Sequence, residues 1–296
     1  MNSPTTGGRS QSSALIIDAP GLVFRAYHSL PPMSAPDGTP TNAVFGLLSM
    51  LKKVTADLAP EHVAVVFDAG AKTFRSEAFA DYKAQRPEPA DDLRAQFPIA
   101  IALVEALGLP VFVEPGYEAD DLIASLARVG EGEGHKNFIV TSDRDMLQLI
   151  SPSTTVLIAK KGVSVFAAMD ETAFRAEWGF EPDCFTDYKA LRGDASDNIP
   201  GVRGIGEKTA SALVRKYGHL EQIYAHLDEV TPERYRAALE AGKADAFRFR
   251  DLVTLRRDLT VDWRQGVSKP DTTRPEFLAL ARRLGFKGYI KGGLFD

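Results

Sequence analysis

The chain has 296 residues, of which 44% are hydrophobic and 25% are charged, a composition that is ordinary for a protein with a sizeable buried core. Its formal net charge of -5 gives no indication of a nucleic-acid partner, although carboxylates in a metal site can mask a basic surface elsewhere. Cys184 is the single cysteine, which excludes an intramolecular disulfide and fits a reducing cytoplasm, and we expect it to be a packed, inert thiol.

The N-terminal stretch, residues 1–13, is rich in Ser, Thr and Gly and is expected to be a disordered tail. It lacks the apolar core that a signal peptide needs. No apolar run in the sequence approaches the roughly 20 residues that span a membrane, so we expect no membrane association.

Three apolar segments that each end in an aspartate are predicted to be buried parallel strands. They cover residues 14–18, 62–68 and 137–143. Helical patterns lie between them, near residues 42–58, 97–107 and 119–128. Strands that alternate with helices indicate an α/β fold with a mainly parallel central sheet and flanking helices. Ligands bind beyond the carboxyl ends of such strands, so the three aspartates are expected to point to one place.

The rest of the pattern divides the chain into parts. Basic and aromatic residues gather between about residues 71 and 98, where Pro87 and Pro89 interrupt any helix. Farther along, short helical patterns are separated by Gly and Pro, and one amphipathic helix is expected near residues 276–284. We therefore expect an α/β domain over residues 14–183 and a smaller helical domain over residues 184–296.

Nine acidic residues are candidate metal ligands. Each has an ordinary structural explanation on its own, since aspartates form turns at strand ends and cap helices. As a set they are harder to explain, because crowded like charges destabilise a fold unless cations neutralise them. The nine are Asp18, Asp68, Glu118, Asp120, Asp121, Asp143, Asp145, Asp194 and Asp197.

The spacing of these acids favours a metal site. Three of them stand at the start of a predicted helix, within residues 116–121, where a cap needs only one. Asp143 and Asp145 are two residues apart, on one side of an extended strand end, and Asp194 and Asp197 are spaced as neighbours on a helical turn. Oxygen ligands without His or Cys suit Mg²⁺ or Mn²⁺, and two such ions roughly 4 Å apart can hydrolyse a phosphodiester.

A glycine-rich segment, residues 198–210, is the second strong signal. Gly201, Gly204 and Gly206 let a backbone approach closely, and the helix that follows offers free N–H groups to a phosphate. Lys208 adds positive charge to that helix. The alternative is a plain glycine-rich helix connection, but three glycines followed by a lysine favour a helix-hairpin-helix that holds DNA phosphates without reading sequence.

With these residues in place, the sequence resembles the 5′ nuclease family, which includes the 5′-to-3′ exonuclease domain of bacterial DNA polymerase I, phage 5′ nucleases and, more distantly, flap endonucleases. The matching stretches run in order from about residue 15 to about residue 259. They include residues 24–28, 65–68, 74–75, 82–86, 116–121, 143–145 and 193–208.

The resemblance implies a PIN-like fold and a structure-specific 5′-to-3′ exonuclease and flap endonuclease, active in primer removal and repair. It implies one ion surrounded by Asp18, Asp68, Glu118 and Asp120. It implies a second ion served, in part through water, by Asp121, Asp143, Asp145, Asp194 and Asp197. It implies that three basic residues act on the scissile phosphate: Arg25, Lys83 and Arg86. Lys83 and Arg86 would belong to a helical arch that admits single-stranded 5′ DNA.

The resemblance also implies partners. The chain would be a cytoplasmic monomer at the bacterial nucleoid, bound to DNA with a 5′ flap, a nick or a single-stranded 5′ end. A K⁺ ion would bind carbonyls near Gly201, Val202 and Ile205. The expected DNA contacts are Tyr27, His28, Lys72, Phe74, Arg75, Tyr82, Arg203, Gly204, Gly206 and Lys208.

Two other functions compete with this interpretation. A relative that binds branched DNA but cuts weakly would have no reason to keep all nine acids. A PIN-type ribonuclease shares the acid-tipped sheet but would lack the segment from Gly201 to Lys208. The divergent stretch at residues 285–293 favours a stand-alone nuclease over an excised polymerase domain.

Overall fold

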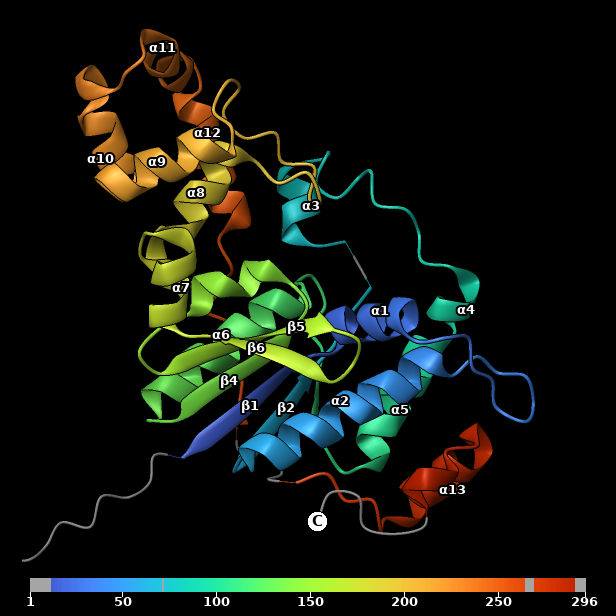
Figure 1. The fold of residues 1–296 in the computed structure, drawn as a ribbon. Coiled ribbons are helices and arrows are strands. Elements are labelled where there is room, and N and C mark those ends of the chain that lie inside the picture. Colours follow the sequence, from blue (N-terminus) through green and yellow to red (C-terminus); the bar gives the residue numbers. More distant parts are fainter. Residues whose placement is uncertain (1–11, 71, 264–268, 291–296) are drawn as a thin grey trace, which may run out of the picture.

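A six-stranded sheet forms the centre of the structure, a computed structural model that describes residues 12–70, 72–263 and 269–290 (Figure 1). Across the sheet the order is β3 (Val111–Phe112), β2 (His62–Val66), β1 (Ser13–Asp18), β4 (Lys136–Thr141), β5 (Thr154–Lys161) and β6 (Val165–Met169). Neighbouring strands are parallel except for the β5–β6 hairpin. The predicted α/β fold with a mainly parallel sheet is confirmed. The expected N-terminal tail lies almost wholly outside the described residues.

The strand register brings the predicted aspartates together. In β1, Ile17 pairs with Val65 of β2 and with Val140 of β4, so the three carboxyl ends lie at one edge. Asp18 is the last residue of β1, whereas β2 and β4 each end two residues before Asp68 and Asp143. All three predicted strands are present; β3, β5 and β6 were not predicted.

Helices cover both faces of the sheet, which explains why its strands are apolar throughout. Leu15 and Ile17 of β1 face a buried cluster that includes α1 (Ala19–Ser29), α2 (Asn42–Leu58), α5 (Gln96–Ala106) and α13 (Pro275–Leu284). Ala14 and Ile16 face a second cluster built on α6 (Ala119–Gly132). The helices predicted from periodicity are confirmed, and the buried sheet gives the acids a rigid base.

Helix α1 was not predicted, because Pro20 and Gly21 are poor helix formers. Proline is tolerated in the first turn, where its missing N–H would have no helical partner. The Asp18 carboxylate accepts a hydrogen bond from the backbone N–H of Gly21 at 3.1 Å. The end of β1 therefore doubles as the cap of α1, and this fixes the Asp18 side chain.

Beyond β6 every regular element in the described residues is a helix (Figure 1). The α-helices are α7 (Glu171–Trp178), α8 (Phe185–Arg192), α9 (Glu207–Tyr217), α10 (Leu220–Ala225), α11 (Glu233–Ala241) and α12 (Lys243–Val253). Short 3₁₀ turns connect several of them, including η2 (Pro182–Cys184) and η3 (Leu227–Glu229). These helices share the α6 cluster, whereas α13 packs against α5 on the other face of the sheet. No described helix is both long enough and apolar enough to cross a membrane.

The segment predicted to form an arch contains less helix than the resemblance implied. Its helices are α3 (Phe74–Ala78) and α4 (Asp91–Arg94), and residues 79–90 between them form turns and irregular backbone. Pro87 and Pro89 explain the difference, because proline lacks the N–H that a helix interior needs. The expected helical arch is thus corrected to an irregular crossing from α3 to α4, visible in Figure 1.

Candidate active site

Acidic side chains from separate elements meet beyond the carboxyl edge of the sheet. They line a cavity of about 1150 Å³ that also receives side chains from the α3–α4 crossing and from α8. Seven of the nine predicted acids line it: Asp18, Asp68, Glu118, Asp120, Asp143, Asp145 and Asp194. Asp197 adjoins this set, and Asp121 points elsewhere.

The strand-end aspartates are held by neighbouring backbone. Asp18 accepts from Gly21 N–H and from the Thr141 hydroxyl. Asp68 accepts from the backbone N–H of Ala119 at 2.8 Å, which ties the end of β2 to the start of α6. Burial raises the pKa of Asp18 to about 7, and burial likewise raises the pKa of Asp68. Both carboxylates are therefore costly to ionise without a nearby cation.

The start of α6 contributes Glu118 and Asp120. Glu118 caps the helix and accepts hydrogen bonds from Lys83 Nζ at 2.6 Å and from the Tyr82 hydroxyl at 2.9 Å. No described side chain donates a hydrogen bond to Asp120. Burial, followed by the charges of Asp143 and Asp18, raises the pKa of Asp120 well above its ordinary value. Among the described groups, only the more distant charge of Lys83 favours the ionised form of Asp120.

A second group of acids stands beside the first. Oxygen atoms of Asp145, Asp194 and Asp197 lie within 4.8 Å of one another. Two details of the predicted geometry are corrected. Asp194 and Asp197 lie on a tight loop closed by a bridge between Asp194 and Ile199, not on a helix. Asp143 has extended backbone and caps the 3₁₀ helix η1 (Arg144–Leu149), but Asp145 lies in that helix and donates its N–H to Asp143 at 2.8 Å, so the two do not share an extended strand end.

Lys189 is a site residue that the sequence did not reveal. It lies on α8 and is 3% exposed, with its Nζ 2.6 Å from Asp194 and also paired with Asp145. The lysine charge holds the pKa of Asp194 down at about 2. Burial and the Asp143 charge nevertheless raise the pKa of Asp145 to about 7. One lysine thus offsets only part of the charge of three carboxylates.

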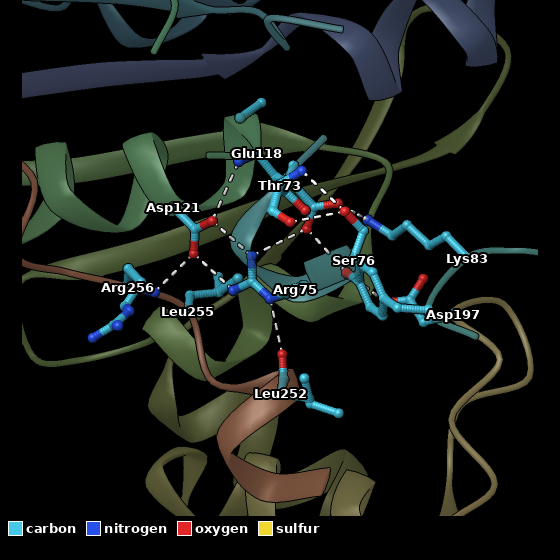
Figure 2. A network of polar contacts seen from close by, with 12 residues as sticks. Thr73, Arg75, Ser76, Lys83, Glu118, Asp121, Asp197, Leu252, Leu255 and Arg256 are labelled. Carbon is cyan, nitrogen blue, oxygen red and sulfur yellow. Dashed lines mark hydrogen bonds and ion pairs between the residues drawn. The ribbon is translucent and has the colours of Figure 1, made fainter. Parts of the chain in front are cut away.

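Asp121 does not belong to the cavity. Both of its oxygens accept from the Arg75 guanidinium, at 2.6 and 2.7 Å, and both residues are buried (Figure 2). Asp121 follows Asp120 by one residue, and the turn of about 100° per residue in a helix directs it toward the core. The structure therefore does not support the predicted roles of Asp121 as a metal ligand and of Arg75 as a DNA contact.

Arg75 joins three parts of the chain. Besides Asp121, it donates to Glu118 of α6 at 3.1 Å. At the end of α12 it also donates to the backbone carbonyl of Leu252 at 2.9 Å (Figure 2) and to that of Thr254 at 3.1 Å. The network links α3, the start of α6 and the segment after α12. It therefore supports Glu118 through Arg75, which like Asp121 is buried.

Basic residues of the α3–α4 crossing overhang the acids. Lys83, in the left-handed region with φ of 55°, extends its Nζ to Glu118. Arg86 donates to Asp197 at 2.7 Å and half of its side chain is exposed. Tyr82 is buried beneath them, so the structure does not support its predicted contact with DNA. Arg25 is absent from the cavity lining, because its Nε donates to the carbonyl of Gly162 at 2.9 Å.

The other expected DNA contacts lie at or near the surface. Lys72 and His28 are exposed, whereas Phe74 and Tyr27 are half-buried. The Tyr27 hydroxyl donates to Asp92 at 2.8 Å, across from α1 to α4. These contacts stay predictions.

The glycine-rich segment separates exposed from buried positions. Arg203, Gly204, Gly206 and Lys208 are exposed. The residues expected to offer carbonyls to K⁺ are buried: Gly201, Val202 and Ile205. Gly204 has φ of 93°, which favours glycine. Gly206 caps α9, and a Cβ added there would meet no atom within 4 Å.

Comparison with known proteins decides the family. A family model described as the 5′-3′ exonuclease N-terminal resolvase-like domain matches residues 13–179. A second model, the 5′-3′ exonuclease C-terminal SAM fold, matches residues 180–273. The chain belongs to the 5′-3′ exonuclease family. The family resemblance found in the sequence is confirmed, and with it the nuclease class of the chain.

Relatives of this 5′-3′ exonuclease are longer proteins. It is 38% identical to DNA polymerase I of Bacillus caldotenax over 278 residues, which cover 94% of this chain and 32% of the relative. It is 39% identical to DNA polymerase I of Pseudomonas aeruginosa over 289 residues, which cover 95% of this chain and 31% of the relative. The chain thus spans about a third of the length of these relatives.

Solved structures share the fold. A bacteriophage T5 D15 flap endonuclease, solved in a pseudo-enzyme-product complex with DNA and metal ions, superposes with a TM-score of 0.67 at 23% identity, covering 81% of this chain and 88% of that one. The catalytic core of Rad2, solved with a DNA substrate, gives a TM-score of 0.60 at 16% identity, covering 93% of this chain and 88% of that one.

Proposed function

We propose that this family member is a structure-specific 5′ nuclease that removes nucleotides from 5′ ends and cuts 5′ flaps in DNA, in primer removal and repair. The observation that carries the proposal is the acid-lined cavity overhung by Lys83 and Arg86. Acids alone would repel DNA phosphates. Crowded carboxylates can bind divalent cations, and long cationic side chains beside them can contact the phosphodiester that those cations hold.

The donor set fits Mg²⁺ or Mn²⁺. The cavity offers carboxylate oxygens from seven acids, and hard oxygen ligands are those that these two ions prefer. The unpartnered Asp120 and the raised pKa values of its neighbours are what a site completed by cations would have. One ion would be held by Asp18, Asp68, Glu118 and Asp120. A second would be held by Asp143, Asp145, Asp194 and Asp197.

Three basic side chains would act together with the bound cations. When bound, the two cations would supply an activated water and neutralise charge on the leaving oxygen. Lys83 and Arg86 would turn from Glu118 and Asp197 to the scissile phosphate, where their charges oppose the developing negative charge. Lys189 would keep Asp145 and Asp194 in place, because its Nζ contacts both.

The test is the size of the cleavage products. DNA carrying a 5′ label would be offered as a 5′ flap, a nicked duplex, a single strand and a 3′ flap, each with Mg²⁺. We expect flap-length and short 5′ products from the first three and no cut in the 3′ flap. Tight binding of the 5′ flap without cleavage would instead support a branched-DNA-binding relative, and equal cutting of both flaps would contradict 5′ specificity.

Lys83→Met is expected to slow the chemical step much more than it weakens binding. A cation that meets the phosphate mainly in the transition state contributes to the rate, and losing one such group costs about a hundredfold. Single-turnover rates at saturating flap DNA measure this. Lys136→Met, at an exposed lysine that begins β4, is the control and should leave that rate nearly unchanged. A normal rate with weaker affinity for Lys83→Met would mean that Lys83 only attracts DNA.

The helix-hairpin-helix is proposed to hold duplex phosphates away from the cut. Lys208→Ala should weaken binding about equally for unrelated duplex sequences, because a phosphate contact carries no sequence information. It should also lower the slope of log affinity against log salt by about one. Binding of two unrelated flap substrates over a salt series measures both, and an unaltered slope would remove Lys208 from the interface.

Gly206 separates a binding role from a structural one. Its φ is -90° and its Cβ position is open, so the fold itself does not demand glycine there. Gly206→Val should therefore change stability little while weakening DNA binding, because the branched side chain blocks the approach of a phosphate to the start of α9. Loss of stability with normal affinity would show a structural turn. Binding of K⁺ by carbonyls near Gly201, Val202 and Ile205 belongs to the same proposal.

A further inference from the structure

A second group of metal-binding side-chain types lies outside the acidic cavity. Asp183 and Cys184 stand in η2, just before α8, and His219 caps α10. The ligand atoms of these three residues lie within 4.8 Å of one another. None of the three lines the acidic cavity, and the nuclease chemistry makes no use of them.

The distances approach those of a tetrahedral site. Cys184 Sγ is 3.9 Å from His219 Nε2 and 3.4 Å from an Asp183 oxygen. The other Asp183 oxygen is 3.8 Å from His219 Nε2. A tetrahedral zinc ion with bonds of about 2.3 Å to sulfur and about 2.0 Å to nitrogen places those two ligand atoms about 3.5 Å apart. Only small side-chain movements separate the three groups from such an arrangement.

A buried carboxylate orients the histidine. His219 Nδ1 is 2.9 Å from Asp187 Oδ2, whereas Nε2 lies 3.8 Å from Asp183, and Cys184 Sγ is 3.9 Å from both ring nitrogens. A proton on Nδ1, donated to Asp187, would leave Nε2 free to bind a metal. Asp187 is 1% exposed and is itself held by Arg250 at 3.1 Å and by the backbone N–H of Leu220 at 3.3 Å. A carboxylate behind a ligating histidine is the usual support of a metal site.

We propose that Cys184 Sγ, His219 Nε2 and the Asp183 carboxylate form a site for a zinc-class transition metal, distinct from the Mg²⁺ or Mn²⁺ centre. A thiolate and an imidazole select such metals over Mg²⁺. Cys184 is 5% exposed, whereas Asp183 and His219 reach solvent, which leaves an entry path and a fourth position for water. The thiol expected to be inert thereby gains a function.

The site has a structural consequence. A bound ion would join the start of α8 to the start of α10, and α8 carries Lys189 into the acidic cavity. Burial, with Asp183 adding to the effect, raises the pKa of the Cys184 thiol to about 12, and a metal ion binds the thiolate form. Metal binding therefore releases one proton to solvent.

Cobalt tests the site, because Cys184 is the only cysteine in the chain. The full chain is titrated with Co²⁺ in excess Mg²⁺, and the near-ultraviolet thiolate-to-cobalt charge-transfer band is followed. We expect one equivalent of Co²⁺ to produce the band and Zn²⁺ to remove it. Cys184→Ser should show no band, and the exposed His219→Ala should bind Co²⁺ at least about tenfold more weakly.

His226→Ala is the matched control. His226 lies in the same helical part, stacks on Tyr217 and is not in the group of possible ligands, so its removal should leave the cobalt titration unchanged. Circular dichroism of each variant checks that it is folded. The proposal is overturned if the folded wild-type chain gives no charge-transfer band, or if His219→Ala binds Co²⁺ as tightly as His226→Ala.

Discussion

Asp120→Asn is expected to reduce the single-turnover rate of flap cleavage by about a thousandfold at saturating DNA, while the affinity for DNA changes little. The substitution keeps the size of the side chain and removes the charge that has no described hydrogen-bond donor. If Asp120 holds a cation that neutralises the transition state, the loss is of the size seen when such stabilisation is removed. Rates at saturating flap DNA with Mg²⁺ measure it.

The same variant makes an opposite prediction for stability without metal. Replacing a carboxylate among Asp18, Asp143 and Glu118 relieves repulsion, so the free energy of unfolding in EDTA should stay equal or rise. Asp251→Asn, at an exposed position of α12, is the control for both measurements and should change neither. Full cleavage by Asp120→Asn, or its unfolding in EDTA, would argue against the metal assignment.

Arg75→Met should lower the free energy of unfolding by about 3–5 kcal/mol, because it leaves the carboxylate of Asp121 buried without its partner. The variant also frees the carbonyls of Leu252 and Thr254, which Arg75 holds at the end of α12. Urea unfolding measures the loss. Arg75→Lys should recover little, because an ammonium cannot replace the two-pronged contact with Asp121.

Two further variants separate burial from charge. Arg94 pairs with Asp91 and Glu88 at the surface, so Arg94→Met should change the free energy of unfolding little. The double variant Arg75→Met with Asp121→Leu should recover part of the loss, since no unpaired charge remains buried. If Arg75→Met costs no more than Arg94→Met, the buried network does not carry the stability assigned to it.

The sequence predicted the sheet and most of the acids because both follow from local patterns. Apolar runs that end in aspartate define buried strands, and the parallel sheet then brings Asp18, Asp68 and Asp143 to one edge. The sequence pattern also predicted the start of α6. What the spacing alone could not give was the direction of each side chain, so Asp120 and Asp121 received the same role although only Asp120 faces the cavity.

The misses share a physical cause. Arg75 and Lys189 are buried charged residues, and charged residues are exposed in most proteins, so nothing in their local sequence marks them. Each is buried because an acid far away in the chain, Asp121 or Asp145, completes the pair. The arch is a different case, because Pro87 and Pro89 signalled the break and the family resemblance suggested a helix instead.

The central claim is that the acid-lined cavity cuts 5′ DNA only when divalent cations occupy it. The most direct test is single-turnover cleavage of a 5′-labelled flap by EDTA-treated protein over a titration of Mg²⁺. We predict no cleavage without the metal, and a rate that rises more steeply than the first power of Mg²⁺ concentration, because two ions must bind. Cleavage at an unchanged rate in EDTA would contradict the account.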